Sequence, residues 1–207
     1  MNYKFTIILF FNIFFLATNN AETLINGSIE SGKTKSTTCA ACHGADGNSI
    51  NPIWPSIAGQ HATYAEKQLK AYKNGVRIDP LMTSMTTMLS DQDIADLAVY
   101  YENLTAKQNS INDDSSIIKG EKIYRGGNIN SGVSACIACH GPQGKGNPAA
   151  LYPSVNSQFA MYTAKQLRDY ASGLRKTDEP TQIMRDIASR LTEEEILSVS
   201  LYIQGLY

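Results

Sequence analysis

The stretch CAACHGADGNS (residues 39–49) is followed about a hundred residues later by CIACHGPQGKGN (136–147), and both contain the pattern Cys-x-x-Cys-His-Gly. These two stretches hold all four cysteines of the 207-residue chain and two of its three histidines. Thiol and imidazole groups gathered in this way indicate that the chemistry of the protein resides in the two motifs.

The repeat extends well beyond the two motifs, and the chain reads as a duplicated unit of about 90 residues. The matching pairs are WPSIAGQ (54–60) with YPSVNSQ (152–158), TYAEKQLKAYKNGVR (63–77) with MYTAKQLRDYASGLR (161–175), and residues 82–104 with residues 184–206. A polar stretch without hydrophobic periodicity, 105–116, separates the copies and is typical of a linker. We predict a first domain at 22–108, a linker at 109–115 and a second domain at 116–207.

Hydrophobic spacing predicts helices in both units, and no run of alternating residues indicates a strand. The helical patterns are Ala65, Leu69, Tyr72 and Val76 in the first unit, and Thr163, Leu167, Tyr170 and Leu174 in the second. Ser90 with Asp93, and Thr192 with Glu195, have the spacing of capping boxes at the start of a last helix. The fold class expected is therefore all-α, with two tandem domains whose small cores leave room for a bulky prosthetic group.

The N-terminal segment resembles a secretory signal peptide. A single Lys4 precedes an apolar run from Phe5 to Ala17, and Ala21 is a plausible last residue before cleavage. A membrane anchor is the alternative, although the run is shorter than the roughly 20 residues that a spanning helix needs. We expect residues 1–21 to be a signal peptide and the protein to be exported to the periplasm.

Cys-x-x-Cys-His is the sequence mark of covalent c-type haem attachment. Two cysteines three positions apart lie on one side of a helical turn, where both thiols reach the vinyl groups of a haem, and the next residue offers its imidazole to the iron. We therefore predict two covalent haems c. Their attachment residues are Cys39 and Cys42 in the first unit and Cys136 and Cys139 in the second, with His43 and His140 on the iron.

Three other uses of the cysteines compete with haem attachment. A thioredoxin-like redox pair requires a βαβ setting that this sequence lacks. A zinc site of four cysteines, or structural disulfides in an oxidising compartment, leaves the His-Gly after each pair unexplained.

The duplication also selects the second iron ligand, for which methionine is common in electron carriers. Met82 and Met184 each lie eight residues before the cap of the last helix, so they occupy equivalent positions. Met85 is the main rival to Met82, although Met85 and Met88 have no methionine counterpart in the second unit and fit the role of core filler better.

Pro55 and Pro153 follow the haem histidines by 12 and 13 residues. A loop of this kind could supply the carbonyl that accepts the other ring nitrogen of the histidine, and a plain turn explains the prolines equally well. His61 has no counterpart in the second unit, and we expect it to be a surface or rim histidine.

The sequence as a whole resembles the dihaem cytochrome c4 family, periplasmic two-domain electron carriers of bacterial respiratory chains. The resemblance covers nearly all of the mature chain and is carried by the two cysteine motifs together with WPSIAGQHATYAEKQL, MTSMTTMLSDQDIADLAVYY, GEKIYRGG, MYTAKQLRDY, IMR and YIQGLY. It implies two cytochrome c folds related by a pseudo-twofold axis. It also implies His43–Met82 and His140–Met184 as axial pairs, and a supporting role for Pro55 and Pro153 beside the histidines.

The resemblance further implies that Gly32 and Gly120 lie where the first helix of each unit crosses the last, against Tyr101 and Tyr202. Its function would be delivery of electrons from a quinol-oxidising complex, or another donor, to a terminal haem–copper oxidase, with peripheral membrane association possible. A haem subunit of a larger dehydrogenase and a dihaem peroxidase are the alternatives. The formal net charge of −1 gives no basic surplus that would indicate a nucleic-acid partner.

Overall fold

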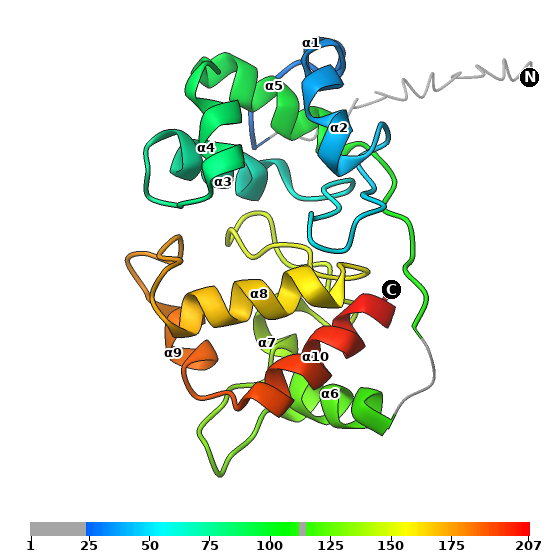
Figure 1. Ribbon diagram of the computed structural model, residues 1–207, viewed down its shortest axis with the longest axis vertical. Coiled ribbons are helices and arrows are strands. Elements are labelled where there is room, and N and C mark those ends of the chain that lie inside the picture. Colours follow the sequence, from blue (N-terminus) through cyan, green and yellow to red (C-terminus); the bar gives the residue numbers. More distant parts are fainter. Residues whose placement is uncertain (1–23, 112–114) are drawn as a thin grey trace, which may run out of the picture.

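The protein consists of two helical halves stacked on each other, α1–α5 and α6–α10, joined by an extended connection along one side (Figure 1). The computed structural model describes residues 24–111 and 115–207. Within these ranges no β-strand forms, and only two isolated bridges occur, Asn128–Val133 and Asn147–Tyr152. The prediction of an all-α fold is thus confirmed. None of the described helices has the length and apolar character needed to cross a membrane.

The two halves repeat one order of elements. The first half contains α1 (Ile29–Lys35), a 3₁₀ turn η1 (Ser36–Thr38), α2 (Ala40–His43), α3 (Ala62–Lys73), α4 (Pro80–Thr87) and α5 (Asp91–Glu102). The second contains α6 (Ser115–Gly126), α7 (Ile137–His140), α8 (Ala160–Ala171), α9 (Ile183–Ala188) and α10 (Glu193–Gly205). The predicted signal peptide, residues 1–21, lies outside the described residues, as does part of the predicted linker.

Local sequence signals define most helix ends. Both predicted capping boxes are present: Ser90 begins α5 and Thr192 begins α10, each exchanging hydrogen bonds with the acidic residue three positions on. The predicted helix that ends at Val76 in fact ends at Lys73, because Gly75 takes a positive φ of 69° that stops the helix. Val76 is therefore exposed outside α3, and Leu174 is likewise exposed beyond α8.

The first and last helices of each half cross at a glycine. A Cβ on Gly32 would lie 2.1 Å from the carbonyl oxygen of Asp96, and a Cβ on Gly120 would lie 2.1 Å from that of Ser198. No side chain fits in that space, so only glycine permits the crossing. The tyrosine beside Gly120 is Tyr202, as expected. The expectation for Gly32 is wrong by one residue, because Tyr100 rather than Tyr101 packs there.

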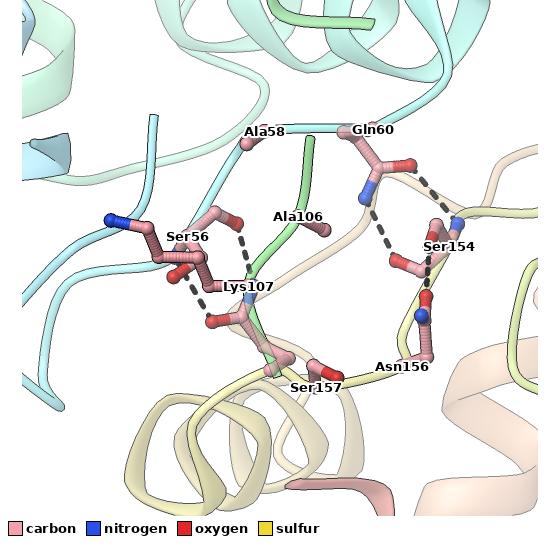
Figure 2. A pocket seen from close by; sticks show the side chains of 9 residues that line it. Ser56, Ala58, Gln60, Ala106, Lys107, Ser154, Asn156 and Ser157 are labelled. Atoms are coloured by element: carbon pink, nitrogen blue, oxygen red, sulfur yellow. Dashed lines mark hydrogen bonds between the residues drawn. The ribbon is translucent and has the colours of Figure 1, made fainter. Parts of the chain in front are cut away.

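Reciprocal hydrogen bonds join the two halves: a glutamine side chain of each half bonds the backbone of a serine in the other half. The amide of Gln60 donates to the Ser154 carbonyl (2.8 Å) and accepts from the Ser154 N–H (3.0 Å). Gln158 does the same with Ser56, at 2.8 and 3.1 Å. Figure 2 shows this region, where a cavity of about 20 Å³, the size of one water, lies between the halves.

The described part of the connection between the halves is held down by side chains. Asn48 of the first half donates to the Thr105 carbonyl (3.1 Å) and accepts from the Lys107 N–H (2.8 Å). On the second half, Asn109 donates to the Ser157 carbonyl at 2.5 Å. The chain between the units is therefore anchored to both of them.

Candidate haem-binding sites

Each Cys-x-x-Cys-His motif forms one short helix. Cys39 caps the N-terminus of α2, and Cys42 lies one turn further on, directly before His43. The second motif repeats this arrangement around α7. All four cysteines are partly exposed and none forms a disulfide. Both thiols of each pair are thus free to form thioethers, as two-point haem attachment requires.

The histidine of each motif is buried and held by a backbone carbonyl. His43 and His140 are each 8% exposed. His43 Nδ1 lies 2.9 Å from the Pro55 carbonyl oxygen, and His140 Nδ1 lies 3.0 Å from that of Pro153. A neutral imidazole that donates Nδ1–H to this carbonyl keeps the Nε2 lone pair for a metal. Burial lowers the pKa of both histidines, despite the carbonyl's opposing effect, and so favours this neutral form.

A folded-back loop places each proline beside its histidine. In the first half the Gly47 carbonyl accepts from the N–H groups of Ile57 and Ala58, at 2.8 and 2.9 Å. In the second half the Gly144 carbonyl accepts in the same way from Val155 and Asn156. Both glycines have positive φ, and Cβ atoms there would touch the returning chain. The same local turn therefore aims a proline carbonyl at each imidazole.

Met82 and Met184 are half-buried on equivalent short helices. Asp79 caps α4 by accepting from the N–H groups of Leu81 and Met82, both at 3.1 Å. Met85 is 54% exposed and Met88 is 88% exposed. The interpretation of these two methionines as core filler is therefore wrong, because both are more than half exposed.

A hollow of about 450 Å³ opens beside the first motif, next to Cys42 and Trp54. Its lining mixes apolar residues such as Ile50 with polar ones such as Asp46, and neither His43 nor Met82 is among the lining residues.

The two alternatives that use ionised cysteines find no support. Burial raises the pKa of the Cys136 thiol to about 11, whereas a thioredoxin-like pair needs a readily formed thiolate. No cluster of three or more cysteine, histidine or acidic residues within 24–111 and 115–207 could hold a metal ion. The four cysteines therefore do not assemble a zinc site.

His61 contacts the second half instead of lying free at the surface. Its Nε2 lies 2.6 Å from the carbonyl oxygen of Lys145. Phe159 occupies the equivalent position in the second unit, so this link has no mirror partner. Thr63 adds a second link without a mirror partner, since its hydroxyl donates to the Pro148 carbonyl at 2.9 Å and the equivalent residue is Met161.

Sequence reasoning missed the polar residues that join the halves. They are Ser56, Gln60, Gln68 and Arg77, with their counterparts Ser154, Gln158, Gln166 and Arg175. A signal was present, because each polar residue is identical in the two copies while many of its neighbours differ. Their role in joining the halves was not predicted, because each copy was considered as a separate domain.

Comparison with known proteins gives consistent matches over both halves. The family model for cytochrome c matches residues 29–105 and again residues 117–206. A cytochrome c4 of Pseudomonas aeruginosa is 43% identical over 181 residues, which span 87% of this chain and 90% of that protein. The thiosulfate dehydrogenase electron acceptor of Stutzerimonas stutzeri is 32% identical over 79% of this chain and 76% of its own length. The crystal structure of reduced cytochrome c4 from Pseudomonas stutzeri superimposes with a TM-score of 0.85 at 42% identity, covering 87% of this chain and 100% of that one.

Proposed function

The chain belongs to the cytochrome c4 family of dihaem electron-transfer proteins, and we propose that it is a periplasmic carrier in a bacterial respiratory chain. It has two cytochrome c domains and carries two covalent haems c. In the proposed role it accepts single electrons from a quinol-oxidising complex, or another donor, and delivers them to a terminal haem–copper oxidase. Its encounters with these partners are brief and small, as is usual for redox proteins.

Within this proposal each cysteine motif attaches one haem. Cys39 and Cys42 hold the first haem, and Cys136 and Cys139 hold the second. The axial pairs are His43 with Met82 and His140 with Met184. Each iron supplies a one-electron ferrous–ferric couple when bound.

The chain's own residues keep both iron positions fixed. The carbonyls of Pro55 and Pro153 orient the two imidazoles through Nδ1 and leave Nε2 free to bind the metal. Met82 and Met184 would supply the second ligand of each iron, which would leave no position for a small substrate. This arrangement suits electron transfer and not catalysis, so we propose that the protein is not an enzyme.

The proposed organisation follows the duplication. Residues 1–21 form a signal peptide that is removed on export, 22–108 and 116–207 form the two domains, and 109–115 link them. The mature protein is proposed to reside in the periplasm, with peripheral contact to the membrane possible and no nucleic-acid partner.

The observation that supports the proposal is that each half contains a buried histidine held by a proline carbonyl and, on a short helix at the equivalent position, a half-buried methionine. The test is an optical and near-infrared spectrum of the purified protein with a pyridine haemochrome count. We expect two haems c per chain, low-spin iron and a sulfur-to-iron charge-transfer band that decreases by about half in Met184→Ala, because one of two sulfur ligands is removed. High-spin iron, or carbon monoxide binding to the reduced native protein, would contradict the carrier function.

A second function differs only in the partner. The relative named as a thiosulfate dehydrogenase electron acceptor favours a role beside a larger dehydrogenase, with this chain as its haem c subunit. Co-purification of a catalytic subunit with the chain would support that role. A dihaem peroxidase is the remaining alternative, and turnover of peroxide by the isolated protein would favour it.

A further inference from the structure

The loop that leads to the predicted methionine ligand is longer in the second half than in the first. Arg175 lies nine residues before Met184, whereas Arg77 lies five residues before Met82. In the first half Asp79 caps α4 directly, because its carboxylate accepts from the N–H of Met82 and from that of the preceding residue, both at 3.1 Å. The second half, with four additional residues in this loop, holds its methionine helix differently.

In the second half the carboxylate that holds the methionine helix comes from further back along the chain. Gln182 occupies the cap position of α9 in a left-handed conformation (φ 57°), and its side chain makes no capping hydrogen bond. Asp178 takes this role instead. Its Oδ2 accepts from the backbone N–H of Arg185 at 2.9 Å, and its Oδ1 accepts from the Nε–H of the same arginine at 2.8 Å. One carboxylate thus holds both the backbone and the side chain of the residue that directly follows Met184.

The Asp178–Arg185 pair is buried and is fixed by the loop that carries it. The side chain of Asp178 is 6% exposed and that of Arg185 is 16% exposed. The Asp178 carbonyl accepts from the N–H of Gln182 at 3.0 Å, which closes the loop on itself, and the more exposed Glu179 forms a second ion pair with the arginine. Loss of one partner of a buried ion pair leaves an uncompensated charge, so this pair resists displacement.

The other side of α9 is turned toward the second cysteine motif. Ile187 lies three residues after Met184, on the same face of the helix, and packs against the core of the second half. Cys136 and Ile137 of the motif pack against the same core. The half-buried thioether and the imidazole of His140, whose Nδ1 is held by a carbonyl, therefore belong to one core, and this donor set fits a haem iron.

We propose that Asp178 and Arg185 are positioning residues that hold Met184 as the axial ligand of the second haem. The inference rests on the proposed dihaem function and assigns these two residues a role in it. The carboxylate of Asp178 is bonded one residue beyond Met184, so a shift of the loop moves the methionine with it. A methionine held in this way is less easily displaced from the iron. Asp79 has the corresponding role for Met82 through the N–H groups of α4.

The test is a spectroscopic study of the purified dihaem protein carrying Asp178→Asn. Asparagine has the size of aspartate but offers one acceptor oxygen in place of two, so one of the two bonds to Arg185 is lost. We expect the near-infrared sulfur-to-iron band to lose up to about half of its intensity, because one of the two haems is affected. We also expect one haem to bind added imidazole at a concentration about 10–100-fold lower than in the wild type, the range typical for loss of a group that supports a metal ligand.

The sign of the change in midpoint potential separates positioning from charge. Methionine ligation raises the potential of a haem, so a loosened Met184 lowers one of the two midpoints. We expect this fall in Asp178→Asn and also in Arg185→Gln, although the two substitutions change the local charge in opposite directions. A purely electrostatic role would raise the midpoint in Asp178→Asn and lower it in Arg185→Gln. Opposite shifts with an unchanged near-infrared band would overturn the inference.

The double variant Asp178→Asn with Arg185→Gln leaves no unpaired buried charge, and it keeps the inference testable if a single variant fails to fold. We expect it to show the same loss of the band. Arg168→Gln is the matched control and should behave as the wild type, because Arg168 lies on α8 of the same half and pairs with the exposed Glu193.

Two outcomes separate the inference from the proposed function. A band of full intensity in the double variant would reject the role of the pair and leave the carrier function intact. Absence of the band from the wild type would contradict the methionine ligation on which both depend.

Discussion

Gln60 and Ser154 exchange two hydrogen bonds across the interface, at 2.8 and 3.0 Å, and Gln158 and Ser56 form the same pair with the halves reversed. Each bond joins a side-chain amide to the backbone of a loop that also holds a haem histidine. The contact therefore fixes the two histidine loops relative to each other.

We expect Gln60→Ala combined with Gln158→Ala to loosen the interface without unfolding either half. Four hydrogen bonds across the interface are lost, each contributing about 1 kcal/mol. Hydrogen exchange at residues 56–60 and 154–158 should rise, and small-angle scattering should detect a larger radius of gyration. Gln143→Ala is the control, because Gln143 is exposed. Unchanged exchange in the double variant would show that other contacts hold the halves together.

The assignment of Met82 can be separated from that of Met85. Met82 is half-buried on α4, whereas Met85 is more than half exposed on the same helix. We expect Met82→Ala to remove about half of the near-infrared charge-transfer band, and Met85→Ala to leave it intact. The opposite pattern would transfer the ligand role to Met85.

Because α6 crosses α10 at Gly120, we expect a single methyl group added at this position to destabilise the fold strongly. A Cβ at Gly120 would collide with the Ser198 carbonyl, which belongs to the backbone and cannot rotate away. We expect Gly120→Ala to lower the free energy of unfolding by about 1–3 kcal/mol or more in urea titrations.

Gly126→Ala on the same helix is the matched control. No atom lies within 4 Å of the position that its Cβ would take, so alanine should be neutral or stabilise the helix by up to about 1 kcal/mol. Equal destabilisation by both changes would mean that helix propensity, and not the close crossing, is responsible.

A charge cluster links α1 to α5 in the first half and predicts a pH dependence. Lys35 contacts Asp96 at 2.6 Å and Asp93 at 2.7 Å, and its hydrogen bonds are the largest cause of the lowered pKa of both carboxyls. A carboxyl whose pKa is lowered by folding stabilises the folded state at pH values above its pKa in the unfolded chain, which is near 3.9. This stabilisation is lost as the pH falls through the pKa of the folded protein.

We therefore expect Lys35→Met to destabilise the first half most at neutral pH, with a difference from the wild type that shrinks below about pH 4. Hydrogen exchange of α1 and α5 measures this locally. Lys119→Met is the control, since Lys119 forms an ion pair with the exposed Glu194. A difference that stayed constant with pH would rule out the charge cluster as the cause.

Local patterns in the sequence predicted much of this architecture. The capping boxes at Ser90 and Thr192 and the absence of strands from the described ranges follow from spacing within a few residues. The duplication follows from matching stretches about a hundred residues apart. The helix predicted to include Val76 failed for an equally local reason, because the pattern counted an apolar residue beyond the glycine that ends α3.

Features that depend on how elements meet were not predictable in the same way. The register of Gly32 against Tyr100 is set by the crossing of α1 and α5, and a shift of one residue leaves the helical pattern intact. The exposure of Met85 depends on which face of a short helix meets the core. The hydrogen bonds of Arg77 and Arg175 to the opposite half could be predicted only with the knowledge that one copy packs against the other.

The reciprocal hydrogen bonds between glutamine and serine make the contact between the halves isologous. This is the kind of self-complementary surface that two identical subunits form around a twofold axis. Here both copies lie on one chain, and the connection between them is anchored to each by Asn48 and Asn109. Their association is therefore unimolecular and has a high effective concentration. Dilution that would separate two independent haem subunits leaves this pair assembled.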